Sequence, residues 1–417
     1  MKAIRIGICI LIAFAVLSFG GVESWGNAVL EIGAAMVFVW WAVTATVRGQ
    51  VEIFGNWLFV PFLGLGIIGL VQYACGASVY PYLTKIELLR WSAYGLLLFL
   101  AAQSFQTKEH IKQFVWFLLS MQFVVSLFGI IQHFSFNGKL YWMVALPADA
   151  NPFGPFVNPN HFAGFVELIA PLGLALLLFP SRSRLQAPLL LLFTIVPIGA
   201  VFLSASRAGI IVVVLECALL VFLSRAYRME RRQLLGATAV GLLAGSMILW
   251  LGVTTALERF EQLAHQGVNR ELRVALYRDT WRIFLNHPWT GTGLGTLIVV
   301  YPRYESFYNG TTVDHAHNDF LELLADTGLI GGLCGVLFVW LLFRRGVSNF
   351  RGATRGSARA AVLGPLVGCA GLLLHSLLDF NLHIPSNALI FLFLACLAAN
   401  DEPRAVPAPL KAQPLQP

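Results

Sequence analysis

Histidine and aspartate side chains gather in one short run of the sequence, Asp314 to Asp319 (Asp-His-Ala-His-Asn-Asp), directly before a long apolar segment. An imidazole can accept the proton of an attacking hydroxyl near neutral pH, and a neighbouring carboxylate can orient the ring. Asp314 and Asp319 flank the histidines His315 and His317 and are the nearest such carboxylates in the sequence. We therefore favour general-base chemistry for this cluster.

Two other interpretations of the cluster remain open. Imidazole and carboxylate groups are zinc ligands, although the spacing of His315 and His317 is not that of a standard zinc site. Alternatively, the histidines cap the following helix or form hydrogen bonds with its first turn. We predict that the protein binds no metal ion and needs no cofactor.

Arginines that could bind an anion occur at two other places. Arg207 lies in a tight turn (Ser-Arg-Ala-Gly) between apolar segments, where an arginine is costly unless it meets an anion or a lipid headgroup. The alternative is that its side chain simply extends to the membrane interface. Arg270 and Arg273 begin a stretch up to Asn286 that lacks glycine and proline and repeats apolar residues at helical spacing. We expect a helix there, whose arginines bind phosphate or form an exposed basic face.

The segment after this predicted helix has the composition of a turn. The helix should end at His287-Pro288, because the residue before a proline disfavours helical backbone angles. Three glycines then follow in alternate positions, at Gly291, Gly293 and Gly295. They permit tight turns, in which a backbone without side chains either approaches a ligand or simply reverses direction.

The elements that must position these residues are built for a lipid environment. Hydrophobic residues make up 58% of the 417-residue chain and charged residues 12%, and apolar blocks approach the ~20 residues that cross a bilayer. We predict an all-α polytopic membrane bundle with one transmembrane domain, residues 1–400, and a disordered cytoplasmic tail, residues 401–417. About twelve spans are expected, at residues 4–22, 28–47, 57–75, 86–102, 112–134, 161–179, 187–204, 207–223, 234–256, 319–343, 360–378 and 385–400.

The distribution of arginine and lysine predicts the orientation of these spans. With the N-terminus in the cytoplasm, nearly all basic residues of short connections fall on the cytoplasmic side, so both termini are expected there. The formal net charge of +7 is spread over these connections and forms no patch for nucleic acid. The exterior side then has two longer loops, residues 135–160 and 257–318. The first span also has the layout of a signal peptide, but we favour an uncleaved span.

Several short motifs occur together in the chain. A His-Asn pair at His317 is followed after nine residues by Gly-Leu-Ile-Gly at Gly328, and upstream lie the Arg207 turn, Arg273, His287-Pro288 and the glycine turn. Two further blocks are Phe156–Phe162 and His375–Phe380. In this order and over roughly residues 155 to 390, the motifs resemble the bacterial O-antigen ligase and O-antigen polymerase family.

The resemblance implies a membrane glycosyltransferase that acts on undecaprenyl-diphosphate-linked glycan at the periplasmic face of the bacterial inner membrane. By the family motif, His317 would be the general base, and Arg207 and Arg273 would hold the donor diphosphate. Transfer would invert the anomeric centre and need no metal. Supporting roles are expected for His315, Asp314, Asn318, Arg270 and His161. The expected partners are this lipid-linked donor, a lipid A-core or other glycan acceptor, and membrane lipids, without nucleic acid.

The sequence leaves the acceptor open. Ligation to lipid A-core, polymerisation of O-antigen or exopolysaccharide repeats, and protein glycosylation would use the same motifs. A small-ion transporter is the alternative from a different class of protein. It is disfavoured because the two halves of the chain contain no obvious matching pair of short, broken spans.

Overall fold

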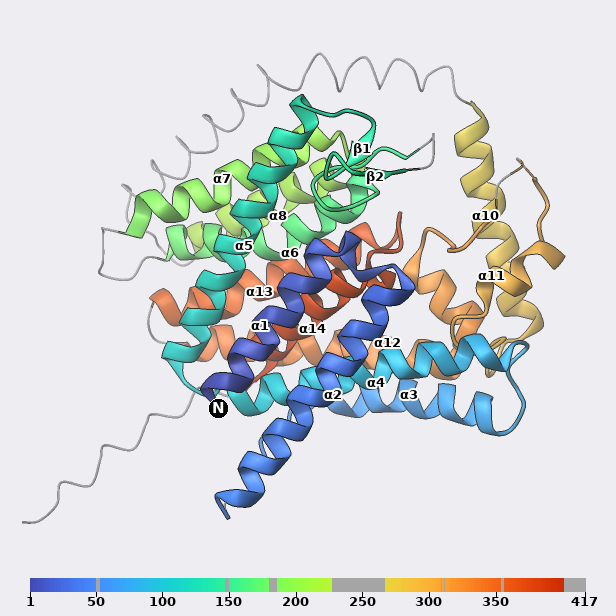
Figure 1. Cartoon of the computed structure of the whole chain (residues 1–417), viewed down its shortest axis with the longest axis horizontal. Coiled ribbons are helices and arrows are strands. Elements are labelled where there is room, and N and C mark those ends of the chain that lie inside the picture. Colours follow the sequence, from blue (N-terminus) through green and yellow to red (C-terminus); the bar gives the residue numbers. More distant parts are fainter. Residues whose placement is uncertain are drawn as a thin grey trace, which may run out of the picture.

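The computed structural model describes residues 1–49, 53–146, 150–179, 186–226, 267–308, 310, 312–353 and 356–400. These residues form a bundle of α-helices (Figure 1). In chain order the helices are α1 (Lys2–Leu17), α2 (Ser24–Val47), α3 (Phe59–Ala74), α4 (Pro81–Ser104), α5 (Lys108–Phe134), α6 (Pro159–Leu178), α7 (Ala187–Ser204), α8 (Arg207–Ala226), α10 (Gly267–Asn286), α11 (Leu297–Val300), α12 (Asp319–Gly352), α13 (Gly356–His375) and α14 (Pro385–Ala399).

The remaining regular elements are short. They are the 3-10 helices η1 (Phe19–Gly21), η3 (Tyr301–Arg303) and η4 (Asn381–His383), and the antiparallel strands β1 (Lys139–Leu140) and β2 (Val144–Ala145). The predicted all-α class is therefore confirmed.

Six helices within the described ranges are long and apolar enough to cross a membrane: α2, α5, α6, α7, α12 and α13. Helices α3 and α14 are apolar but shorter. The expected spans at residues 4–22, 86–102 and 207–223 coincide with α1, α4 and α8. The expected span 234–256, the start of the predicted loop 257–318 and the tail 401–417 lie outside the described residues. The total of about twelve spans therefore stays a prediction.

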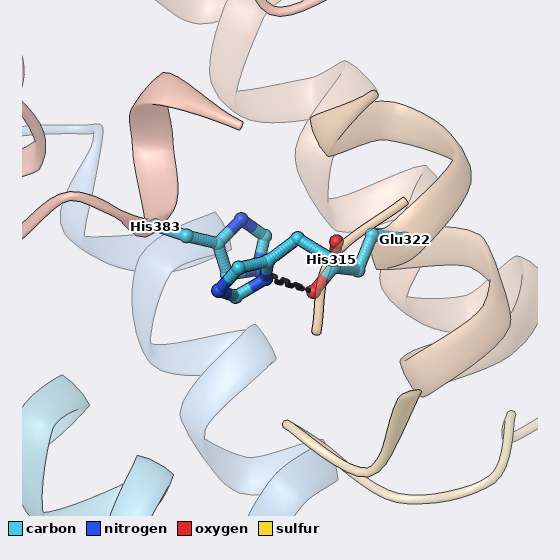
Figure 2. A group of neighbouring side chains, drawn as sticks. All are labelled: His315, Glu322 and His383. Atoms are coloured by element: carbon cyan, nitrogen blue, oxygen red, sulfur yellow. Dashed lines mark hydrogen bonds and ion pairs between the residues drawn. The ribbon is translucent and has the colours of Figure 1, made fainter. Parts of the chain in front are cut away.

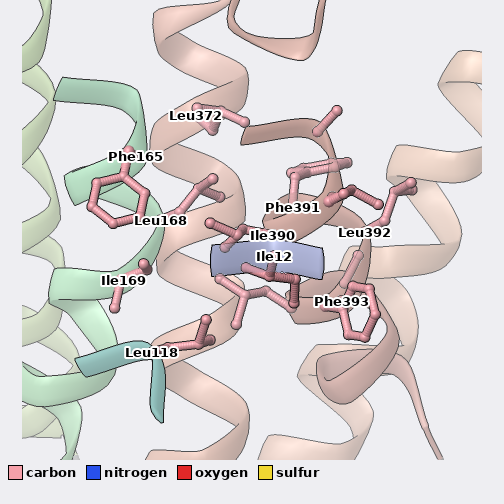
Figure 3. Packing of buried hydrophobic residues seen from close by; sticks show 14 of the residues in the cluster. Ile12, Leu118, Phe165, Leu168, Ile169, Leu372, Ile390, Phe391, Leu392 and Phe393 are labelled. Carbon is pink, nitrogen blue, oxygen red and sulfur yellow. The ribbon is translucent and has the colours of Figure 1, made fainter. Parts of the chain in front are cut away.

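Helix α14 lies in the middle of the bundle. All its residues are buried, and it packs against α1, α4, α6, α12 and α13. Figure 3 shows Ile390 and Phe393 of α14 among Ile12 of α1, Leu118 of α5 and Phe165 of α6. Beyond its first turn α14 is apolar on all sides, as expected of a helix without a solvent face. The helices around it are thereby held to a common core.

Helix α10 stands at one end of the bundle, beside the start of α12 (Figure 1, yellow). It ends at Asn286, directly before His287-Pro288, so the predicted helix and its end are confirmed. The start of α12 lies close to the ends of other helices, because the Asp319 amide donates a hydrogen bond of 3.0 Å to the Ser376 carbonyl after α13. Polar residues from distant parts of the sequence therefore meet at this end of the bundle.

The segment after α10 packs backbone to backbone against α12. Gly328 interrupts the helical angles of α12 with φ 65° and ψ −165°, and the next amide, of Leu329, donates to the Pro288 carbonyl at 2.8 Å. A Cβ atom at Gly328 would lie 2.4 Å from the carbonyl carbon of Trp289, so only glycine fits. The expected turn is present, and its bare backbone approaches α12.

A residue of helix α3 forms hydrogen bonds to both segments where the turn after α10 meets α12, a contact that we call the backbone crossing. The side-chain amide of Gln72 donates to the carbonyls of Thr290 at 2.6 Å and Asp326 at 2.7 Å, and its oxygen accepts from the Leu294 amide at 3.0 Å. Gln72 is buried, and these bonds satisfy its amide inside the protein. The glycine turn is therefore held from two sides.

Candidate active site

The histidine run forms a tight connection into α12. His317 has a left-handed backbone with φ 48°, which is uncommon for a residue with a side chain. The next residue, Asn318, is the N-cap: its Oδ1 accepts from the amides of Phe320 at 3.1 Å and Leu321 at 3.0 Å. The cap is therefore the asparagine and not a histidine. The other part of that interpretation, a hydrogen bond from a histidine to the first turn of the helix, is confirmed for His315, whose Nδ1 lies 2.8 Å from Glu322 Oε1.

The carboxylate that faces His317 comes from another part of the chain. Nδ1 of His317 lies 3.3 Å from Oδ1 of Asp379, which follows α13 and is buried. This is an ion-pair distance without good hydrogen-bond alignment, since His317 Nδ1 has no hydrogen-bond partner. The expectation that Asp314 or Asp319 orients the histidine is wrong, because α12 begins at Asp319 and directs this carboxylate towards η4.

Asp379 is held in its charged form by its surroundings. Burial alone would raise the pKa of this carboxyl, but interactions with His317 and His161 outweigh burial and hold the pKa well below its usual range. The Phe380 amide also donates to Asp379 Oδ1 at 2.8 Å. A buried carboxylate that stays ionised can fix the orientation of an imidazole and stabilise its protonated form.

Asp379 also connects two of the motif blocks. Asn160, in the first turn of α6, donates from its side-chain nitrogen to Asp379 Oδ2 and accepts from the Ser206 hydroxyl at 2.7 Å. Ser206 caps α8, since its Oγ accepts from the Gly209 amide at 3.2 Å. Arg207 is the first residue of α8, and its side chain is exposed. This chain of contacts places the start of α8 beside the carboxylate that faces His317.

Helix α10 reaches the same region through Tyr277. The Tyr277 hydroxyl lies 2.9 Å from the carbonyl oxygen of His317 and 3.3 Å from that of Leu377. Arg273 precedes Tyr277 by about one turn of α10, so both lie on one helix face, and the Arg273 side chain is exposed. Burial raises the pKa of Tyr277, Arg273 opposes this rise, and Asp379 adds to it. Arg273 and Asp379 are therefore both within electrostatic range of this tyrosine.

The ring of Phe380 joins three histidines. Its centroid lies 4.4 Å from that of His315, 4.8 Å from that of His161 and 4.9 Å from that of His317. His161 is buried in α6, and its Nε2 lies 3.9 Å from Asp379 Oδ1. His161 thus borders the carboxylate, while its ring packs against Phe380.

His315 belongs to a separate group, which we call the His383 cluster: His315, Asp319, Glu322 and His383. Figure 2 shows the rings of His315 and His383 next to each other, on one side of the Glu322 carboxylate, and the ring centroids are 4.7 Å apart. Glu322 Oε1 lies 2.8 Å from His315 Nδ1 and 3.3 Å from His383 Nε2, and Asp319 Oδ1 lies 2.6 Å from His383 Nδ1. Burial opposes protonation of His383, but Glu322 and Asp319 outweigh it and raise the pKa of His383 to about 10.

The structure separates the predicted site residues into groups. His317 and His161 lie around Asp379, His315 lies in the His383 cluster, and Asn318 is a helix cap. Asp314 is exposed in the loop. The Arg270 side chain lies outside the described residues.

Two side chains at the site were not anticipated from the sequence. Tyr277 could have been found from its position one helical turn after Arg273, and Glu322 from its position in the first turn of α12. Neither position carries a signal strong enough to indicate its partner, because both partners come from distant segments.

An apolar pocket of about 600 Å³ adjoins the His383 cluster. Asp319 and His383 line it, together with apolar residues of α3, α4, α12 and α14 such as Phe62, Trp91 and Leu323. Its lining therefore combines the ionisable groups with side chains typical of a lipid-facing surface.

The fold and site together define a multi-pass membrane protein with an ionisable cluster at one end of its helix bundle. Residues 189–336, which carry Arg207, Arg273 and His317, match the family model described as O-antigen ligase. This match supports the O-antigen ligase family for the chain and confirms the resemblance carried by the motifs. No curated protein matches the chain at a significant level.

Proposed function

We propose that this protein transfers a glycan from undecaprenyl diphosphate to an acceptor hydroxyl at the periplasmic face of the bacterial inner membrane. The observation that carries the proposal is the contact between His317 and Asp379, because Asp379 also connects to the turn that bears Arg207. The family match over residues 189–336 supports the same class of reaction.

In the proposed step, His317 is the general base. Its Nδ1 faces Asp379, which leaves Nε2 to accept the proton of the acceptor hydroxyl. The hydroxyl oxygen forms a bond to the anomeric carbon, while the bond from that carbon to the diphosphate oxygen breaks with inversion. Undecaprenyl diphosphate leaves with the electron pair of the broken bond. The His317 side chain is 33% exposed, so an acceptor can reach it.

Arg207 and Arg273 are proposed to hold the diphosphate. Guanidinium groups remain charged at all relevant pH values and match phosphate oxygens with two parallel hydrogen bonds. Both side chains are exposed and stem from segments tied to the His317 region, through Ser206 and Tyr277 respectively. Two arginines can stabilise the negative charge that develops on the leaving group, so we propose that the step needs no metal ion at the diphosphate.

The apolar pocket of about 600 Å³ is proposed to take part of the prenyl chain of the donor. Its apolar lining offers surface that a hydrocarbon chain can cover, and its ionisable lining residues are Glu87, Arg90, Asp319, Asp326 and His383. The acceptor is either a lipid A-core glycan or a second lipid-linked glycan. The size distribution of the product distinguishes ligation from polymerisation.

The proposal is tested by glycan transfer in membranes supplied with undecaprenyl-diphosphate-linked oligosaccharide and candidate acceptors. His317→Ala and Arg273→Ala should lose transfer by about 100-fold or more, as expected for a general base and an anion-binding group. His287→Ala and Arg278→Ala are matched controls, since both side chains are exposed and Arg278 lies on another face of α10. Both controls should retain transfer.

Three outcomes would contradict the proposal. Full transfer by His317→Ala would remove this histidine from the mechanism. Equal losses in Arg273→Ala and Arg278→Ala would favour a general basic face over a diphosphate site. Absence of product from the wild type with every acceptor would favour transport.

A further inference from the structure

The His383 cluster joins the loop before α12 and the start of that helix to η4, which is distant in the sequence. His315 comes from the loop before α12, Glu322 from the first turns of α12, and His383 from η4. One ligand atom from each of these residues lies within 4.8 Å of the others. Two imidazoles and one carboxylate form a donor set that binds zinc and related divalent transition metals in proteins.

The distances in the cluster suit a small cation. Ligand atoms arranged tetrahedrally around zinc at about 2.0 to 2.1 Å are about 3.3 Å apart. Glu322 Oε1 lies 3.3 Å from His383 Nε2 and 2.8 Å from His315 Nδ1, so the first separation fits as it stands and the second must widen by about half an ångström. The ligand atoms of the two histidines lie within 4.8 Å of each other. Glu322 is also fixed in place, because its other oxygen accepts from the Ala316 amide at 2.8 Å.

A further carboxylate, that of Asp319, contacts the ring nitrogen of His383 that does not face Glu322. Asp319 Oδ1 lies 2.6 Å from His383 Nδ1, and Asp319 Oδ2 accepts from the Leu382 amide at 3.0 Å. Metal-binding histidines in proteins commonly donate their other ring N–H to a carboxylate, which fixes the tautomer and directs the free nitrogen at the metal. His383 has this arrangement, with Nδ1 towards Asp319 and Nε2 towards Glu322.

The charge balance also favours a divalent cation. The Asp319 and Glu322 side chains are only 4% and 3% exposed, and they lie at ion-pair distance from His383 and His315. Two buried carboxylates need two positive charges nearby. A divalent ion bound between the two imidazoles and Glu322 supplies both charges at one position.

We propose that His315, Glu322 and His383 bind one divalent transition-metal ion, zinc by its ligand chemistry, with Asp319 orienting His383. The His315 and His383 side chains are 27% and 22% exposed, which provides a route for the ion and leaves its fourth position to water. This ion is not part of the transfer reaction proposed above. It ties the loop before α12 to η4 and so positions His317, whose neighbour Phe380 stacks on His315.

Metal binding is tested on the full-length protein purified in detergent micelles, stripped with a chelator and dialysed. Cobalt(II) serves as the probe, because its visible absorption reports tetrahedral coordination. The wild type should take up one equivalent of cobalt, lose the absorption when zinc is added, and retain one equivalent of zinc after gel filtration. His315→Gln and His383→Gln should lose at least 90% of this uptake, while the exposed control His287→Gln should keep it.

The wild-type measurement decides the proposal without any variant. Uptake of less than 0.2 equivalents of both cobalt and zinc at micromolar concentration would overturn it and leave a hydrogen-bonded cluster without an ion. Equal uptake by wild type, His315→Gln and His383→Gln would also overturn it. Folding of each variant is checked by its gel-filtration profile, and a zinc-dependent rise in unfolding temperature is expected for wild type but not for His315→Gln. These readouts are independent of glycan transfer.

Discussion

The Asp379 carboxylate lies 3.3 Å from Nδ1 of His317 and reaches it from the connection between α13 and η4, not from the loop that carries the histidine. Any movement of α13 relative to α12 would therefore change this contact. The separation also leaves room for closer alignment when substrate binds, as is common for catalytic hydrogen bonds.

Asp379→Asn tests the contribution of this carboxylate to transfer. The substitution keeps the shape of the side chain but removes the charge that supports a protonated His317. We expect kcat to fall by about 100-fold or more, with a smaller change in KM, since general acid–base groups contribute at least that much. Asp314→Asn is the matched control, because the Asp314 side chain is exposed in the loop that carries His317. A similar kcat for both variants would contradict an orienting role for Asp379.

The pH dependence of stability should reveal the same carboxylate. The pKa of Asp379 is lower in the folded protein than its ordinary value of 3.8. Its stabilising contribution is therefore complete above about pH 4 and is lost as the pH falls towards the folded value. The unfolding temperature of wild type should exceed that of Asp379→Asn at pH 6, and the difference should shrink below pH 4. A difference that stays constant down to pH 3 would show that Asp379 does not cause it.

Tyr277→Phe tests the link between α10 and the histidine loop. Loss of the hydroxyl leaves the carbonyls of His317 and Leu377 without this donor and should lower the free energy of unfolding by about 1 kcal/mol. We also expect kcat to fall, because the left-handed backbone at His317 loses a restraint. The control is Tyr304→Phe, whose hydroxyl accepts a bond of 3.0 Å from Asn286. Equal effects on kcat would argue against a specific link through Tyr277.

Gly328→Ala tests the backbone crossing. The new methyl group would meet the Trp289 carbonyl at 2.4 Å, and an L-residue at φ 65° and ψ −165° is strained. We expect a loss of about 2 kcal/mol or more in the free energy of unfolding, measured by denaturation in micelles. Gly66→Ala in α3 is the control, since a Cβ there meets no atom within 4 Å. This control should be neutral or slightly stabilising.

Hydrophobic patterning predicted most of the helices of the fold. The apolar blocks coincide with helices because a helix satisfies its backbone hydrogen bonds within a single segment, as a bilayer without water requires. Patterning did not reveal that α14 is central, since a lipid-facing helix and a buried one have the same apolar composition. Nor did it reveal the interruption of α12 at Gly328, which depends on the approach of Trp289.

The sequence indicated which segments meet near His317. It did not indicate which side chains contact each other there. The resemblance singled out Arg273 and the segments of Asn160, Arg207 and Asp379. Contacts connect these segments in the structure, although α10 is joined through Tyr277, which the resemblance did not name. It could not tell which carboxylate faces His317, because Asp314 and Asp319 are closer in sequence than Asp379. Only tertiary packing decides this, since it brings the end of α13 to the start of α12.

The backbone crossing at Gly328 determines which part of the chain can be exchanged between related proteins. A graft of the region around α10 that stopped before α12 would join Pro288 and Trp289 to a foreign helix and lose their bonds to Leu329 and Ile330. The transplanted segment must therefore continue past Gly328 into the apolar helix. It must also meet a glutamine at the position of Gln72 on α3. In a chimaera, then, the α10 region and part of the membrane domain would have to be inherited together.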